Sequence, residues 1–101
     1  MSIEKSLSAD GTTLTIKMDS KFDFSKVKDF RETYDDVGDE LTTIIVDLSR
    51  TEYMDSSALG MMLNMQKTLS GRPVSYKIQN CQEQVARILK ISRFDKKFDI
   101  S

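Results

Sequence analysis

Residues 42–69 read TTIIVDLSRTEYMDSSALGMMLNMQKTL, and they contain an apolar strand, a polar connection and the beginning of a helix. The aliphatic run at 44–48 is nearly continuous, which is typical of a central strand covered on both faces. A second strand, predicted at 74–78, follows the helix after Gly71 and Pro73. Strand, helix and strand in this order predict a βαβ unit with parallel strands and a right-handed crossover.

The polar connection at residues 49–57 is where this unit would place a functional site, because sites in open α/β sheets form beyond the carboxyl ends of strands. It ends in Asp55, Ser56 and Ser57. Asp or Ser before an apolar helix is most often an N-cap, which satisfies free backbone N–H groups and contributes about 1 kcal/mol. An exposed serine hydroxyl can also accept phosphate, because the kinase supplies the general base. The spacing alone favours a cap.

The N-terminal part of the chain predicts a β-hairpin and an amphipathic helix. Asp10-Gly11 is a hairpin signal, and residues 12–18 alternate cleanly between apolar and polar side chains. Ser25 is a candidate N-cap and Gly38 a natural stop for the helix between them. Apolar residues recur within that helix at spacings of three or four, at Val27, Phe30, Tyr34 and Val37. We expect Phe24, just before the helix, to pack in the core.

The C-terminal part predicts a third helix and a last short strand. Asn80 and Glu83 resemble a capping box that would open a helix with Val85 and Leu89 facing inward. Residues 98–100 are a candidate final strand. The whole chain, residues 1–101, is therefore predicted to be a single α/β domain. Its mixed sheet would have four or five strands, with helices mainly on one face.

Composition excludes several classes of function. The chain has 101 residues, 39% of them hydrophobic and 31% charged, as expected for one soluble globular domain. The net charge is −1 and the basic residues are scattered, so a nucleic-acid partner is not expected. The sequence shows no apolar run long enough to span a membrane and no secretion signal, which predicts a cytoplasmic protein.

The chain is a poor candidate for an enzyme. It has no histidine, which removes the commonest general base and the commonest metal ligand. Without a base near it in sequence, Ser56 is not expected to act as a nucleophile. Its single cysteine, Cys81, offers neither a disulfide nor a thiolate cluster for a metal. We therefore predict no catalytic residue, no metal site and no cofactor.

The predicted helix after Ser56 is rich in methionine. Placing Leu59, Met62 and Leu63 on its inward face leaves Met61 and Met65 on the outer face. Methionine is usually core filler, but an outward pair would form an adaptable contact surface for a partner. Chance exposure is the alternative, since single exposed apolar residues are common.

Residues 53–60, YMDSSALG, resemble the signature of STAS-domain proteins, the bacterial anti-sigma-factor antagonists. The resemblance also includes the IIVDL strand at 44–48, the VARIL stretch at 85–89 and the Phe22-Asp23 step. It implies that Ser56 is phosphorylated by a dedicated serine kinase, with Ser57 as second choice. Ala58 departs from the family pattern, which usually has glycine there. Many members carry a further helix after the last strand, which is expected to be absent or reduced here.

This resemblance implies a non-enzymatic regulator of a partner-switching pathway. The protein would bind a serine kinase or anti-sigma-type protein while Ser56 is unphosphorylated and would be released on phosphorylation, and a protein phosphatase would reset it. The expected partner-binding residues are Asp23, Asp55, Ser56, Ser57, Gly60, Met61 and Met65. Gly60 would allow close approach either of the partner or of the sheet. The alternative function is a STAS module that binds a nucleotide or lipid.

Overall fold

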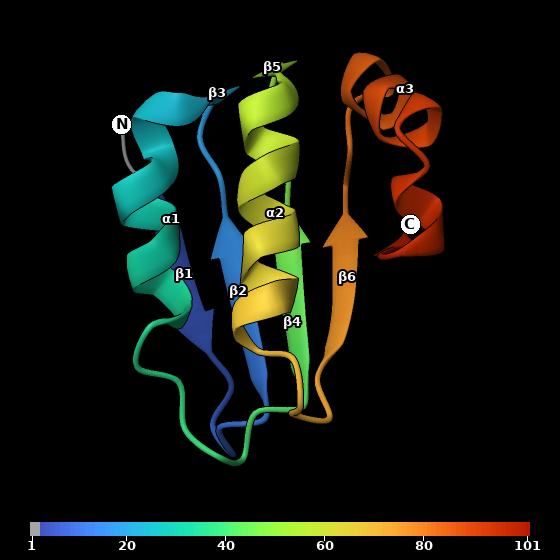
Figure 1. The fold of residues 1–101 in the computed structure, drawn as a ribbon. Coiled ribbons are helices and arrows are strands. Elements are labelled where there is room, and N and C mark those ends of the chain that lie inside the picture. The colour runs from blue at the N-terminus through green and yellow to red at the C-terminus, as the bar shows by residue number, and fades with distance from the viewer. Residues whose placement is uncertain (1–2) are drawn as a thin grey trace.

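The computed structural model describes residues 3–101 and shows a single α/β domain built on one five-stranded mixed sheet (Figure 1). The first two strands pair antiparallel, and every other neighbouring pair in this sheet is parallel. The strands in their order across the sheet are β1 (Glu4–Leu7), β2 (Thr13–Lys17), β4 (Thr43–Asp47), β6 (Ser75–Gln79) and β7 (Asp99–Ile100). This arrangement confirms the predicted fold class, the hairpin and the final short strand.

Three helices cover one face of this sheet: α1 (Val27–Tyr34), α2 (Ser56–Thr68) and α3 (Glu83–Ile91) (Figure 1). On β4, Ile44 and Val46 face the helices and are fully buried, whereas Ile45 on the other face is only half-buried. The prediction that this strand is covered on both faces was therefore wrong. The aliphatic run reflects a central position in the sheet, with strands on both sides, rather than a second layer of helices.

The predicted βαβ unit is present as β4, α2 and β6. Both strands run parallel with aligned ends, so that Asp47 lies opposite Gln79 at their carboxyl ends. Between β4 and α2 the chain forms the two-residue strand β5 (Tyr53–Met54), which pairs in parallel with β3 (Lys21–Phe22). This small second sheet lies at the carboxyl end of the large sheet, where α2 begins (Figure 1). The carboxyl edge at which the site was predicted is therefore formed by a small sheet of its own and not by an irregular loop alone.

Two helix starts differ from the prediction. The first helical segment begins with the short 3-10 helix η1 (Phe24–Lys26), and its N-cap is Asp23 rather than Ser25. Asn80 does not cap α3, because it adopts a left-handed conformation with φ of 62° and its amide donates to Asp47. Asn is one of the few residues that tolerate this conformation. Its presence at position 80 therefore reflects a turn in the backbone and not a helix cap.

The inward face of α2 also differs from the prediction. Met61 and Met65 are 7% and 0% exposed, whereas Leu63 is 37% exposed. The prediction that Met61 and Met65 form an exposed pair was therefore wrong. The helix is apolar around much of its circumference, so spacing alone does not define its buried side. Met61 lines a groove together with Val27 and Arg31 of α1, so the buried face is turned from the leucines toward α1, which lies next to α2 (Figure 1).

Candidate functional site

The first turn of α2 is held by Asp55. The side chain of this residue accepts hydrogen bonds from the backbone N–H groups of Ser57 and Ala58, at 3.1 and 3.4 Å. This is an N-cap, the ordinary structural role of a polar residue that precedes an apolar helix. Asp55 therefore has a structural role, and Ser56 is the first helical residue rather than the cap.

Ser56 and Ser57 are in different environments. The hydroxyl of Ser57 donates to the Asp55 carboxylate, and the residue is half-buried. Ser56 is exposed, at the N-terminal end of α2. An incoming phosphoryl group can reach the Ser56 hydroxyl without breaking the cap, whereas reaction at Ser57 would first break a hydrogen bond. The Ser56 hydroxyl is therefore open to solvent and the Ser57 hydroxyl is engaged in the cap, and the choice of Ser56 over Ser57 stays a prediction.

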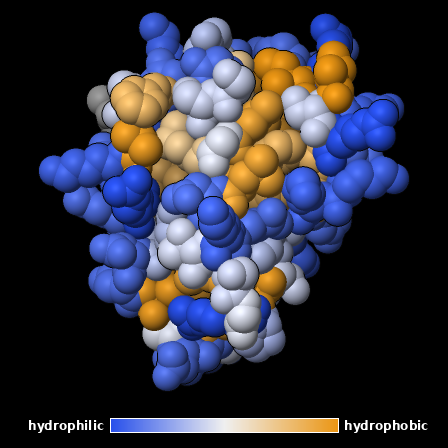
Figure 2. Space-filling view, in the orientation of Figure 1, coloured by the Kyte–Doolittle hydropathy of each residue, from blue (hydrophilic) through white to orange (hydrophobic). Residues whose placement is uncertain are grey.

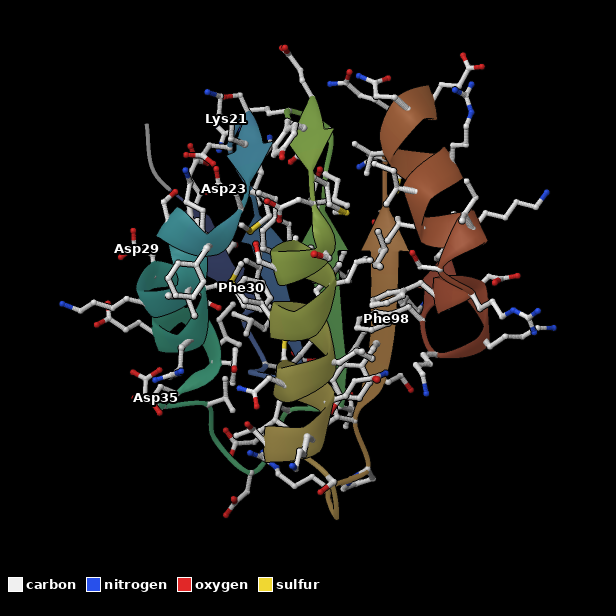
Figure 3. All side chains as sticks on the ribbon, turned by 45° about the horizontal axis from the view of Figure 1, so that its top comes forward. Lys21, Asp23, Asp29, Phe30, Asp35 and Phe98 are labelled. Atoms are coloured by element: carbon white, nitrogen blue, oxygen red, sulfur yellow. The ribbon has the colours of Figure 1, made fainter. Side chains whose placement is uncertain are left out.

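The same cap occurs a second time beside it. Asp23 has an extended backbone like that of Asp55, and it accepts from the backbone N–H and hydroxyl of Ser25. The two aspartates follow directly after the paired strands β3 and β5, where Phe22 lies opposite Met54. The two Asp-x-Ser segments thus start neighbouring helical segments at one edge. Figure 3 shows Asp23 at this edge, next to Lys21.

This duplication places Phe24 in the position that corresponds to Ser56. Phe24 is 71% exposed, so the prediction that it packs in the core was wrong. Phe22, two residues earlier, is fully buried, and its ring centroid lies 5.3 Å from that of Phe30. Phe30 points from α1 toward α2 (Figure 3). β3 ends at Phe22, and Phe24 begins η1. The two rings therefore do not share one face, as residues i and i+2 of a continuous strand would, and Phe24 is left on the surface beside the start of α2.

A shallow groove of about 370 Å³ lies between η1, α1 and α2. Its lining consists of Phe24, Val27, Arg31, Ser57, Gly60, Met61 and Asn64. Figure 2 shows the apolar part of this lining at the left of the view, where η1 and α1 lie, with paler and more polar residues to its right. Met61 contributes its small exposed fraction to the groove, whereas Met65 is fully buried and does not line it. The groove brings Ser57, Gly60 and Met61 of the predicted site together.

Gly60 resolves one of the alternatives left open by the sequence. A Cβ atom built on this residue meets no atom within 4 Å, and the residue is exposed. Close packing against the sheet therefore does not explain the glycine. A small residue here leaves room on the outer surface of the first turns of α2, which is compatible with close approach of a partner.

The connection before the site is fixed to the loop after β2. The hydroxyl of Thr51 donates to the main-chain oxygen of Asp19 at 2.9 Å, and both residues are buried. The Asp19 carboxylate forms an ion pair of 3.3 Å with Lys26 of η1. These contacts join the two cap segments through buried polar groups, which are strong constraints because each would be costly to leave unpaired.

Asp23 contributes a negative charge at this edge, with Lys21 and Lys26 close to it. A hydrogen bond from the Ser25 hydroxyl holds the pKa of Asp23 below its ordinary value. Asp23 is therefore ionised at neutral pH. The N-terminal ends of η1 and α2 stabilise this negative charge, because free backbone N–H groups and the helix dipole favour anions.

Sequence reasoning missed two features of this site, the capping role of Asp23 and the exposure of Phe24. The repeated pattern Phe-Asp-x-Ser and Met-Asp-x-Ser, at residues 22–25 and 54–57, was the available signal. Within residues 3–101, no group of three or more His, Cys, Asp or Glu is placed to hold a metal. None of the helices that the structure describes is long and apolar enough to cross a membrane.

Known proteins resemble this chain in sequence and in fold. A family model for the STAS domain matches residues 4–101. A STAS-domain containing protein of Pseudomonas aeruginosa (strain UCBPP-PA14) is 41% identical over 101 residues, and the match covers 100% of both chains.

Solved structures share the fold at low identity. The Bacillus cell fate determinant SpoIIAA in its phosphorylated form is 18% identical with a TM-score of 0.73, and the match covers 99% of this chain and 91% of that one. An anti-sigma factor antagonist from Mycobacterium paratuberculosis is 14% identical with a TM-score of 0.74, covering 98% of this chain and 85% of that one. At these identities the likeness concerns the fold.

Proposed function

The chain belongs to the STAS-domain family, and from this premise we propose that it is a non-enzymatic regulator whose binding to a partner is controlled by phosphorylation of Ser56. The observation that carries the proposal is the position of this serine. It is exposed on the first turn of α2, next to a hydroxyl that is engaged by Asp55 and beside the groove at Gly60 and Met61. An anti-sigma factor antagonist of similar fold, SpoIIAA, has been solved in a phosphorylated form.

A phosphate at this position changes the surface and leaves the fold intact. It adds about −1.5 to −2 charge at neutral pH, and a helix N-terminus favours negative charge. Asp55 caps the helix through its own side chain, so the cap does not depend on the Ser56 hydroxyl. A partner that occupies the neighbouring groove would meet this new charge, and it would bind less tightly.

The partners that fit this switch are a serine kinase or anti-sigma-type protein and a protein phosphatase. The kinase must reach the Ser56 hydroxyl, and the exposed Phe24 beside the groove gives it an apolar contact. The phosphatase would reset the unphosphorylated, binding-competent form. The chain itself needs no catalytic residue for either step, because the enzymes supply the chemistry.

The experiment that tests the acceptor compares two serine variants. The wild type, Ser56→Ala and Ser57→Ala are incubated with a candidate kinase and ATP, and phosphate is mapped by mass spectrometry. We expect no label on Ser56→Ala and a label at Ser56 in Ser57→Ala. Full labelling of Ser56→Ala would move the site to another residue. No labelling of the wild type by any cognate kinase would favour the alternative, a ligand-binding STAS module.

A mimic tests the consequence of the charge. Ser56→Asp should retain the circular dichroism spectrum of the wild type and bind the partner more weakly. Ser6→Asp adds the same charge at an exposed position on β1 and should leave binding unchanged. A loss of helix content in Ser56→Asp would show that the switch works through unfolding and would contradict the argument.

A further inference from the structure

A second apolar surface lies on the side of α2 away from the groove. Leu59, Leu63 and Gln66 are spaced by four and three residues, so they share one side of the helix. The amide of Gln66 donates to the main-chain oxygen of Lys97 at 2.8 Å, which turns this side of α2 toward the segment after α3. Leu63 is 37% exposed and Leu59 is half-buried.

The facing side of α3 is apolar as well. Gln84, Ile88 and Ile91 have the same spacing, and the amide of Gln84 donates to the main-chain oxygen of Glu52, just before β5. Ile91 is 76% exposed, the largest exposed fraction among the large hydrophobic residues that the structure describes. Figure 2 shows apolar surface between the positions of α2 and α3. We call the surface formed by Leu59, Leu63, Ile88 and Ile91 the apolar strip.

One basic residue on each helix flanks this strip. Lys67 lies one helical turn beyond Leu63, and Arg87 lies one turn before Ile91. In the segments 56–68 and 83–97 only Glu83 and Asp95 are acidic, against six basic residues: Lys67, Arg87, Lys90, Arg93, Lys96 and Lys97. The whole chain has a net charge of −1, so these two segments are more basic than the rest of the chain. Arg87 also forms an exposed ion pair of 3.4 Å with Glu83.

We propose that the apolar strip binds an amphipathic helix of a partner protein, with acidic residues flanking the apolar face of that helix. Two rows of aliphatic side chains on neighbouring helices suit the apolar stripe of a third helix, and the basic border is complementary to acidic flanks. A two-fold dimer through the strip is disfavoured, because it would bring Lys67 and Arg87 of both copies together.

This inference deepens the proposed function, because it names the chemistry of the segment that the switch would release. Leu59 lies three residues after Ser56 on the same helix. A phosphate on Ser56 would therefore repel an acidic helix on the strip by like charge, in addition to any effect in the groove. The sign of the switch follows from the charge of the partner helix.

Selection from a peptide library tests the chemistry without any phosphorylation. The displayed helical peptides carry leucine at heptad positions a and d, and every other position is randomised among Glu, Lys, Gln and Ala. Panning against the wild-type protein should enrich Glu over Lys at the positions that flank the leucines. Enriched peptides should bind Leu63→Ser/Ile91→Ser at least tenfold more weakly, and Leu7→Ser as tightly as the wild type. Leu7 is also exposed, but it lies on β1 at the edge of the sheet.

Charge reversal makes the test independent of the apolar variants. Lys67→Glu/Arg87→Glu should shift the enrichment from Glu to Lys, whereas Lys28→Glu, an exposed change on α1, should not. Circular dichroism confirms that each variant is folded. Peptides without a charge bias, or peptides that bind Leu63→Ser/Ile91→Ser equally well, would overturn the proposal.

Two further measurements identify other occupants. If the wild type sediments with vesicles of anionic phosphatidylglycerol and selects no peptide, the strip binds a lipid surface and the proposal is refuted. A dimer in light scattering that Ile91→Ser dissociates would assign the strip to self-association and would also refute it. None of these results depends on a kinase, so a failure here is separate from a failure of the Ser56 switch.

Discussion

Truncation of Met65 tests the orientation of α2, on which both the groove and the apolar strip depend. Met65 is fully buried, whereas Leu63, two residues earlier on the same helix, is 37% exposed. Met65→Ala removes buried methylene and sulfur atoms and leaves a cavity. Leu63→Ala removes a side chain of similar size that already contacts water. The pair therefore separates burial from side-chain size and from helix propensity, since Leu and Met have similar propensities.

The expected magnitudes differ clearly. Emptying a buried Met or Leu site typically costs 2–5 kcal/mol, which combines the lost transfer free energy with the energy of the cavity. In a domain of this size each 1 kcal/mol lowers Tm by about 4–8 °C, so Met65→Ala should melt roughly 10–40 °C below the wild type. Leu63→Ala should lower the free energy of unfolding by less than about 1 kcal/mol.

Urea denaturation followed by circular dichroism measures both variants on one scale. The slope m should stay constant, so that the shift in midpoint reports the change in stability. If Leu63→Ala costs as much as Met65→Ala, or more, then the leucine side of α2 faces the core. That result would remove the apolar strip and the groove together, because both are defined by this rotation of the helix.

Three further predictions concern the cap, acid and the thiol. Asp55→Ala should lower the free energy of unfolding by about 0.5–2 kcal/mol in urea denaturation, because the first turn of α2 loses its cap, and Asp55→Asn should retain most of it. The pKa of Asp23 is lowered in the folded state by the hydrogen bond from Ser25, so its stabilisation is present above the ordinary value of 3.8 and is lost as the pH falls through the folded-state value; melts between pH 7 and 2 should show a shallower loss in Asp23→Asn. Burial raises the pKa of the Cys81 thiol, so iodoacetamide should alkylate the native protein at pH 8 more slowly than the urea-unfolded chain.

Local and short-range patterns in the sequence were sufficient for the architecture. The Asp10-Gly11 turn forms because Asp10 accepts hydrogen bonds from neighbouring groups and Gly11 adopts a φ of 78° without a Cβ penalty. The βαβ unit was predicted because an aliphatic run, an apolar helix and a second strand leave few topologies. The position of the site at the carboxyl edge followed from that topology.

The detail of the site depended on contacts between distant segments. Pairing of β3 with β5 brings the two Asp-x-Ser segments to one edge, so Asp23 became a cap and Phe24 was left exposed. Within residues 22–25 nothing distinguishes Asp23 from Ser25 as the cap, because both side chains can accept a backbone N–H, and only the repeat of the pattern at 54–57 pointed to Asp23. The choice was made by the extended strand that ends at Phe22.

The rotation of α2 was likewise decided by tertiary structure. Apolar side chains at Leu59, Met61, Leu63 and Met65 extend around much of the helix, so several rotations would bury a comparable amount of apolar surface. The sequence by itself determined that this helix packs on the sheet and that it begins beside Ser56. Only the position of α1 next to α2 decided that the methionines are buried and the leucines border the solvent, because packing against a second helix widens the buried face on that side.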